Sequence, residues 1–148
     1  MDNISLENKF LKVRVKLFGA ELTSVFDKET HTEYMYQPDG IHWNKQSPIL
    51  FPNIGAIRNN SFSYKGNDYE ARKHGFARDY AFKLEDNGSD FATFLLTNEM
   101  IEENYPFDFQ LRLKYTLNGR QLDMSYFVTT QSPEMYFAIG GHPAFRVP

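Results

Sequence analysis

The chain has 148 residues, a formal net charge of −3 from 16 basic and 19 acidic side chains, and no cysteine. That length suits one domain, and the lack of cysteine excludes disulfides, thiolate metal sites and cysteine nucleophiles. A mildly acidic chain lacks the basic face of a nucleic-acid binder, and no apolar run approaches the ~18 residues of a membrane span. The first ten residues also lack the apolar core of a secretion signal. We therefore expect a soluble cytoplasmic protein with no nucleic-acid or membrane partner.

Apolar residues recur with a period of two along most of the chain, as in half-buried antiparallel strands. The first such strand is expected over residues 10–17, where alternate positions are apolar: Leu11, Val13, Val15 and Leu17. A second strand is expected over residues 20–26. Residues 48–57 are apolar but contain two prolines and a glycine, so we expect this segment to be buried and irregular.

Three hairpins follow, each with a glycine in its turn. Their arms are residues 61–64 and 69–72, residues 82–85 and 91–97, and residues 110–117 and 121–130. A further strand is expected over residues 135–139. Helix is limited to one turn within residues 99–104, which Tyr105-Pro106 would end. The fold class is therefore all-β, an antiparallel β-sandwich of about ten to twelve short strands in a single domain over residues 1–148.

The end of the chain is unusual for a complete domain. It stops at Pro148 soon after the strand expected at 135–139, with neither a polar tail nor a closing strand. Because chain ends are usually polar and frayed, we expect the sequence to be cut off within a fold.

The first candidate for chemistry is His74, in the run His74-Gly75-Phe76-Ala77-Arg78-Asp79. Gly75 permits a ligand to approach the backbone closely, and a loop with His and Arg four residues apart could hold an anion or a polyol. The same spacing fits a plain turn in which His74 bonds the backbone and Arg78 pairs with Asp79. Both interpretations stay open at this stage.

The second candidate is His142, in the run Gly140-Gly141-His142-Pro143. Pro143 favours an extended His142, and the glycines leave space beside it. A packed histidine in a strand-end turn is an equally good interpretation. Two such loops are more informative than one, because a pair of imidazoles can bind and protonate one small ligand. The other histidines, His31 in a polar loop and His42 beside Trp43, are expected to be exposed or peripheral.

No competing motif is stronger than this pair of loops. The chain has no Gly-rich phosphate loop, no nucleophile elbow and no metal-binding pattern. A metal site built on His74 and His142 stays open as an alternative, but no third ligand is evident, and no metal is assigned to the site. The 14 Phe and 9 Tyr could stack on sugars, although most are expected in the core.

Several runs of residues, in order along nearly the whole chain, resemble the aldose 1-epimerase (galactose mutarotase) family. They are Phe51-Pro52-Asn53-Ile54-Gly55, Ser61-Phe62-Ser63-Tyr64-Lys65-Gly66, His74-Gly75-Phe76-Ala77-Arg78, Tyr105-Pro106-Phe107 and Gly140-Gly141-His142-Pro143-Ala144-Phe145. The branch it resembles most is the bacterial one that is also similar to hexose-6-phosphate mutarotases. The resemblance implies a galactose mutarotase-like β-supersandwich roughly twice as long as this chain. Residues 1–148 are then expected to be its N-terminal half.

The activity implied by the resemblance is interconversion of the α and β anomers of a hexose or hexose phosphate. A base removes the proton of the anomeric hydroxyl, an acid protonates the ring oxygen, and the opened aldehyde rotates before the ring closes again. Histidine suits such proton transfers near neutral pH. The implied partner is a small-molecule sugar or sugar phosphate, and no cofactor is implied.

The resemblance also assigns roles to four residues. His142 would be the general acid at the ring oxygen, and His74 would hydrogen-bond the sugar and hold it in register. Arg78 is placed to meet a phosphate. Arg58 is expected to reach the sugar, although related sequences often carry Gly-Arg where Ala56 follows the glycine here.

One family feature is absent from these residues. The family's catalytic base is a Glu near the C-terminus, which would lie beyond Pro148, so a chain of only these residues is expected to be nearly inactive. Two other interpretations stay open. One is a non-catalytic carbohydrate-binding β-sandwich. The other is a half-domain that pairs with a second copy or with a complementing chain, because its open strand edges would need cover.

Overall fold

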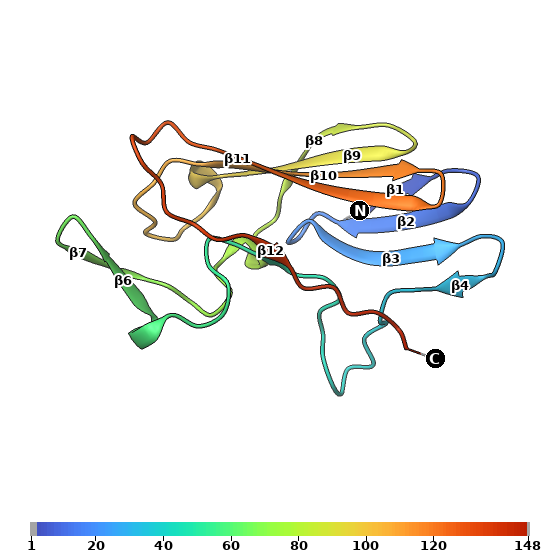
Figure 1. Ribbon diagram of the computed structural model, residues 1–148, viewed down its shortest axis with the longest axis horizontal. Coiled ribbons are helices and arrows are strands. Elements are labelled where there is room, and N and C mark those ends of the chain that lie inside the picture. The colour runs from blue at the N-terminus through green and yellow to red at the C-terminus, as the bar shows by residue number, and fades with distance from the viewer. Residues whose placement is uncertain (1–2, 148) are drawn as a thin grey trace.

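The computed structural model describes residues 3–147 and is built of short antiparallel strands (Figure 1). One four-stranded sheet contains, in sequence order, β1 (Asn3–Glu7), β2 (Leu11–Lys16), β3 (Glu21–Asp27) and β4 (Thr32–Glu33). The other, also with neighbours in sequence order, contains β8 (Lys83–Asn87), β9 (Phe91–Thr97), β10 (Gln110–Asn118) and β11 (Gln121–Thr129). The predicted all-β antiparallel fold is confirmed.

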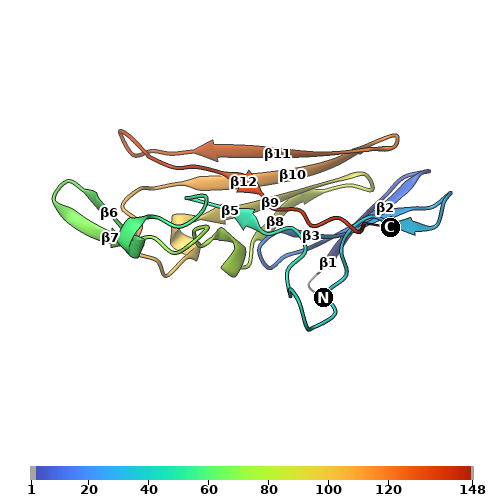
Figure 2. The same cartoon turned by 60° about the horizontal axis from the view of Figure 1, so that its bottom comes forward.

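Two smaller strand pairs complete the fold. The first joins distant parts of the sequence, β5 (Ile49–Leu50) and β12 (Gly140–Gly141). The second is the hairpin of β6 (Ser61–Tyr64) and β7 (Asn67–Glu70), which projects at one end of the molecule in Figures 1 and 2. Short 3-10 turns occur at η1 (Arg58–Asn60), η2 (Ala77–Asp79) and η3 (Asn98–Met100). Among residues 3–147, no helix has the length and apolar character to cross a membrane.

The core lies between the two four-stranded sheets and follows the predicted alternation. From β2 it contains Leu11, Val13 and Val15, and from β10 it contains Leu111, Leu113, Tyr115 and Leu117. The intervening residues of these strands are exposed or half-buried. Since side chains on a strand alternate between its faces, one face of each sheet is buried and the other faces solvent.

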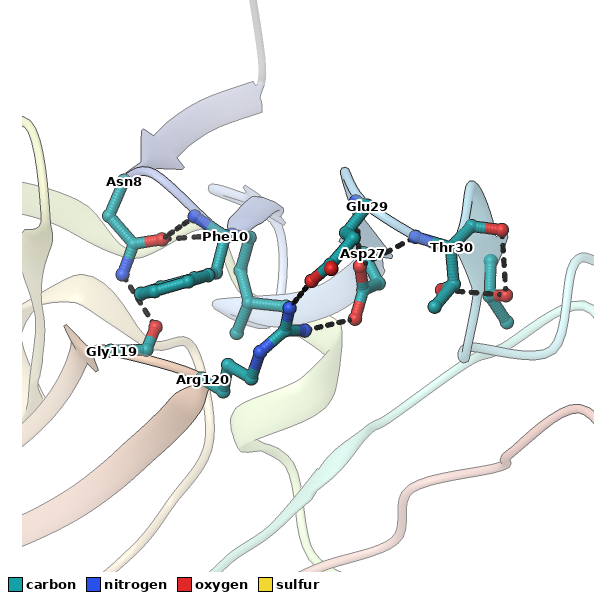
Figure 3. A network of polar contacts seen from close by, with 9 residues as sticks. Asn8, Phe10, Asp27, Glu29, Thr30, Gly119 and Arg120 are labelled. Carbon is teal, nitrogen blue, oxygen red and sulfur yellow. Dashed lines mark hydrogen bonds and ion pairs between the residues drawn. The ribbon is translucent and has the colours of Figure 1, made fainter.

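Polar contacts join the two sheets as well. The buried hydroxyl of Tyr115, on β10, donates to the carbonyl of Ala20, just before β3, at 2.7 Å. At another point Arg120, in the β10–β11 turn, pairs with the buried carboxylate of Asp27 at 2.7 Å and also with Glu29 (Figure 3). The backbone N–H of Thr30 and the Arg120 guanidinium hold the pKa of Asp27 below its usual value despite burial.

Three local expectations need correction. No strand forms over residues 135–139, and the pairing occurs instead at Gly140–Gly141. A ladder needs a continuous partner strand, but this stretch meets the connecting backbone at isolated points such as Ala138 N–H to the Pro52 carbonyl, 2.8 Å. The helical turn expected within 99–104 is a 3-10 turn at Asn98–Met100. The first hairpin turns on two residues with positive φ, Lys65 and Gly66, so its second arm begins earlier, at residue 67.

Candidate functional site

Residues 46–55, called the connecting segment below, hold both histidine-bearing turns. On one side β12 pairs with β5, and the backbone N–H of His142 donates to the carbonyl of Pro48 at 3.1 Å. On the other side the N–H of Phe76 donates to the carbonyl of Phe51 at 2.9 Å. The N–H of His74 donates to the carbonyl of Gly55, also at 2.9 Å. Two turns that are far apart in the sequence are thereby placed against one strip of backbone.

The approach of the His74 turn to this strip depends on Gly75. A Cβ built on Gly75 would lie 2.1 Å from the carbonyl oxygen of Phe51, far inside van der Waals contact. Gly75 also has a φ of +70°, which glycine adopts at little cost. The sequence suggested that this glycine leaves room for a ligand, whereas the structure shows the room filled by the protein's own backbone.

The N-terminal end of the connecting segment is held by a buried carboxylate. Glu21, 1% exposed, accepts hydrogen bonds from the backbone N–H groups of Gln46 (2.6 Å) and Ser47 (2.9 Å). Its other oxygen pairs with Lys16 at 2.5 Å. A buried charge is stable only when it is paired and hydrogen-bonded, and these contacts meet that condition.

The imidazoles of His74 and His142 meet beside the connecting segment. Their ring centroids are 5.9 Å apart and their planes lie at 72°. The imidazole of His142 also packs against the indole of Trp43, with ring centroids 5.4 Å apart and planes at 57°. Three rings from three separate loops therefore form one cluster, with His74 half-buried and His142 exposed.

The ring of His74 has a defined tautomer. Its Nδ1 accepts a hydrogen bond from the backbone N–H of Gly55 at 3.0 Å, so the neutral ring carries its proton on Nε2. Burial lowers the pKa of His74, and the positive charges of Arg78 and Lys73 lower it further. The ring is therefore suited to remain neutral and to donate a hydrogen bond from Nε2.

Arg78 lies in η2, four residues after His74. Its guanidinium donates to the carbonyl of Lys73 at 2.9 Å and lies 3.8 Å from the carboxylate of Asp79. The backbone bonding of His74 and the Arg78–Asp79 pair are what the plain-turn interpretation expects, and both are present. They occur together with the His74–His142 contact, so they do not exclude a binding role for this turn.

The remaining sequence candidates lie outside the ring cluster. Arg58 is exposed in η1, and within residues 3–147 its side chain forms no hydrogen bond or ion pair. His31 is exposed in a loop, and His42 is exposed and bonds Asp39 at 2.6 Å. The described part of the chain contains no cluster of three His, Cys, Asp or Glu that could hold a metal ion.

Two features of the site are not predicted from the sequence. The first is Trp43, which the sequence shows only as a neighbour of His42; its being the single Trp of the chain is the one signal that marks it. The other is a cavity of about 610 Å³ that adjoins Gly75 and is walled by aromatic side chains: Phe62, Tyr64, Phe76, Tyr105, Phe107 and Tyr136. Neither histidine lines this cavity, so it is separate from the imidazole pair.

Known proteins resemble this chain over nearly its whole length. The family model described as aldose 1-epimerase matches residues 2–148. The chromosomal protein LacX of Lactococcus lactis subsp. lactis is 40% identical over 98% of this chain and 51% of its own length. A galactose mutarotase related enzyme from Lactobacillus acidophilus superposes with a TM-score of 0.93 and 37% identity, over 99% of this chain and 49% of its own.

A galactose mutarotase-like protein from Lactobacillus casei ATCC 334 gives a TM-score of 0.91 at 35% identity, over 99% of this chain and 50% of its own. The chain therefore spans about half the length of the relatives it matches. Since sequence and fold agree over that half, the likeness extends to the arrangement of its strands.

We predict that Gly75→Ala destabilises the fold more than a positive φ alone would. A left-handed conformation costs a non-glycine residue about 1–2 kcal/mol, and at Gly75 the added methyl also collides with the Phe51 backbone. Gly66→Ala is the matched control, because Gly66 has a φ of +80° and nothing within 4 Å. Urea denaturation measures both. Equal losses would show that the close approach to Phe51 is unimportant.

We also predict that stability falls as acid protonates His74. Because the folded-state pKa lies below the unfolded value of 6.5, the contribution of the neutral ring is complete above about pH 6.5 and is lost as the pH falls towards the folded value. His74→Gln keeps an acceptor but does not titrate. Urea midpoints between pH 5 and 8 should therefore fall more in the wild type than in the variant. Parallel curves would contradict this assignment.

Proposed function

The chain belongs to the aldose 1-epimerase family, and we propose that it provides the acid-bearing part of a mutarotase site that interconverts the α and β anomers of a hexose or hexose phosphate. The observation that carries the proposal is the contact of two imidazoles from distant turns, 5.9 Å between centroids. Both belong to the runs through which the sequence resembles the family.

His142 is the general acid in this proposal. Its imidazole is exposed, so a sugar can reach it, and a protonated imidazole can transfer its proton to the ring oxygen as the bond from that oxygen to the anomeric carbon breaks. The base takes the proton of the anomeric hydroxyl, which becomes the aldehyde oxygen. Rotation about the adjacent carbon–carbon bond and reversal of the two proton transfers give the other anomer.

His74 holds the sugar in register rather than changing its charge. Its Nδ1 is occupied by the Gly55 N–H, so its Nε2 proton can be donated to a sugar hydroxyl. The lowered pKa of His74 keeps this donor neutral beside an acid that must take up a proton. A neutral neighbour avoids the repulsion that two charged imidazoles at this distance would feel.

The base is proposed to come from outside residues 1–148, as a Glu of the family type. Among residues 3–147, neither His74 nor His142 makes an ion pair with a carboxylate. The same observation favours the second candidate function, a carbohydrate-binding β-sandwich without turnover. Acid–base groups typically contribute about 10²–10⁴-fold each, so the 148-residue chain by itself is expected to bind sugar with little acceleration of mutarotation.

Completion of the domain by further polypeptide is also proposed, either by more of the same chain or by a second copy or complementing chain. Several large apolar side chains are exposed on the C-terminal part: Phe127, Tyr136, Phe137 and Phe145. β11 is also the last strand of its sheet in the described part of the chain. Apolar exposure next to an unpaired strand edge favours association.

We predict that His142→Gln lowers the rate of mutarotation by about 10²–10⁴-fold when it is introduced into the protein as its native source produces it. The intact mass of that protein shows whether it is longer than these residues, which account for 17.3 kDa. Polarimetry with a freshly dissolved anomer measures the rate. His31→Gln, in an exposed loop, is the matched control. Full mutarotation in His142→Gln would contradict the acid role. Sugar binding without any acceleration in the wild type would favour the non-catalytic alternative.

We predict that Arg78→Ala raises KM for hexose 6-phosphate more than for the free hexose, because the guanidinium can pair with a phosphate. Arg14→Ala, an exposed residue on β2, controls for the loss of one positive charge. Initial rates of mutarotation over a range of each sugar provide the comparison. An equal effect on the two sugars would remove the phosphate role from Arg78.

A further inference from the structure

We propose that Trp43 is the positioning residue of His142: its indole packs against the imidazole and holds it in the orientation from which it acts. This inference rests on the proposed acid role of His142. It starts from a difference between the two histidines. The Gly55 N–H orients the ring of His74, whereas within residues 3–147 no hydrogen bond from a side chain or backbone reaches the ring of His142.

Hydrogen bonds fix the backbone of His142, but they do not fix the orientation of its ring. β12 pairs with β5, and the His142 N–H bonds the Pro48 carbonyl. The side chain itself is exposed and would sample several rotamers without a neighbour. The ring contacts that limit it are with Trp43, at 5.4 Å, and with His74, at 5.9 Å. Trp43 is the larger and nearer of these partners.

Trp43 lies in a loop that is attached to the rest of the fold at both ends. Before it, the backbone N–H of Tyr36 donates to the carbonyl of Ala144 at 2.9 Å. The carboxylate of Asp39 then closes a local turn by accepting hydrogen bonds from the N–H groups of Ile41 (2.9 Å) and His42 (3.0 Å). After it, Gln46 bonds the buried Glu21 carboxylate and donates from its side chain to the carbonyl of Thr23 at 2.6 Å. The indole is half-buried between these anchors. The loop can therefore transmit the rigidity of the sheet to His142.

The chemistry of the contact suits an acid. The face of an indole attracts a cation more strongly than other aromatic faces do, so Trp43 packs favourably against a protonated imidazole without competing for its N–H groups. The titratable group that contacts the pair is His74, whose ring centroid lies 5.9 Å from that of His142. The hydroxyl of Tyr126 lies close to Gly141, the residue before His142. His42 is next to Trp43 in the chain, but its ring bonds Asp39 instead.

The first test uses the intrinsic fluorescence of the chain, because Trp43 is its single Trp. An imidazole in contact with the indole changes its surroundings and with them its emission, so we expect His142→Gln to alter the emission of Trp43 at constant pH. His42→Gln, which removes the neighbouring histidine in the sequence, should leave the emission unchanged. Emission that is unchanged in His142→Gln, or that changes equally in His42→Gln, would overturn the proposal.

The second test asks whether Trp43 positions the ring. The ring protons of His142 should carry a ring-current shift in proton NMR spectra, which Trp43→Leu removes and Trp43→Phe retains in part. The ring protons of His74 are an internal reference and should move much less. In the mutarotase assay, Trp43→Leu is expected to lower kcat by roughly 10-fold to 100-fold, since misplacement of about 1 Å can cost up to 10²-fold, with Trp43→Phe between it and the wild type.

These tests separate the two proposals. Fluorescence and NMR on residues 1–148 need no sugar. If they show the Trp43–His142 contact while the protein isolated from its native source shows no mutarotation, the contact stands and the proposed function is contradicted. If His142→Gln abolishes mutarotation while Trp43→Leu leaves the His142 spectrum and kcat unchanged, the acid role stands and the positioning role of Trp43 is overturned.

Discussion

The candidate site depends on one strip of backbone, the connecting segment at residues 46–55. Its carbonyl groups accept hydrogen bonds from both histidine-bearing turns, and the buried Glu21 carboxylate holds its N-terminal end. Buried backbone groups need partners, so this segment cannot move without breaking contacts on both sides. Because the turns share one support, the distance between His74 and His142 is set by the fold rather than by either loop alone.

The two imidazoles are held in different ways, and the difference fits different roles. His74 is half-buried, bonded through Nδ1 and surrounded by positive charge, which keeps its ring neutral. His142 is exposed and oriented by ring contacts. A fixed neutral donor beside an accessible imidazole is the pairing that the proposed anomerisation requires. Two residues of the same type thus differ in the surroundings on which their proposed roles rest.

The chain spans about half the length of the relatives it matches, and its apolar side chains are buried in some places and exposed in others. The apolar side chains of β2 and β10 that meet in the core are buried by other residues of this chain. Phe127, Tyr136 and Phe145, by contrast, are exposed. These residues therefore have their own core, and the proposed further polypeptide would be the one to cover the exposed aromatic side chains.

Much of this protein could be predicted from the sequence, because the controlling physics is local. The alternation of Leu11, Val13 and Val15 determined which face of β2 is buried, and glycine-containing turns determined the hairpins. The order of short motifs indicated the family, and with it the two histidines. Each of these signals lies within a few neighbouring residues, where strand periodicity and turn conformation act.

Only the tertiary structure decided what lies between distant segments. The sequence of residues 135–139 predicts a strand, but this segment has no continuous partner strand. The alternation of apolar and polar residues does not show whether a partner strand is present. Gly75 is required by a contact with Phe51, and Trp43 reaches His142 across the fold. Such contacts depend on the paths of separate loops over a common support. The sequence therefore determined the strands and the candidate residues, while long-range packing and hydrogen bonding decided how those residues meet.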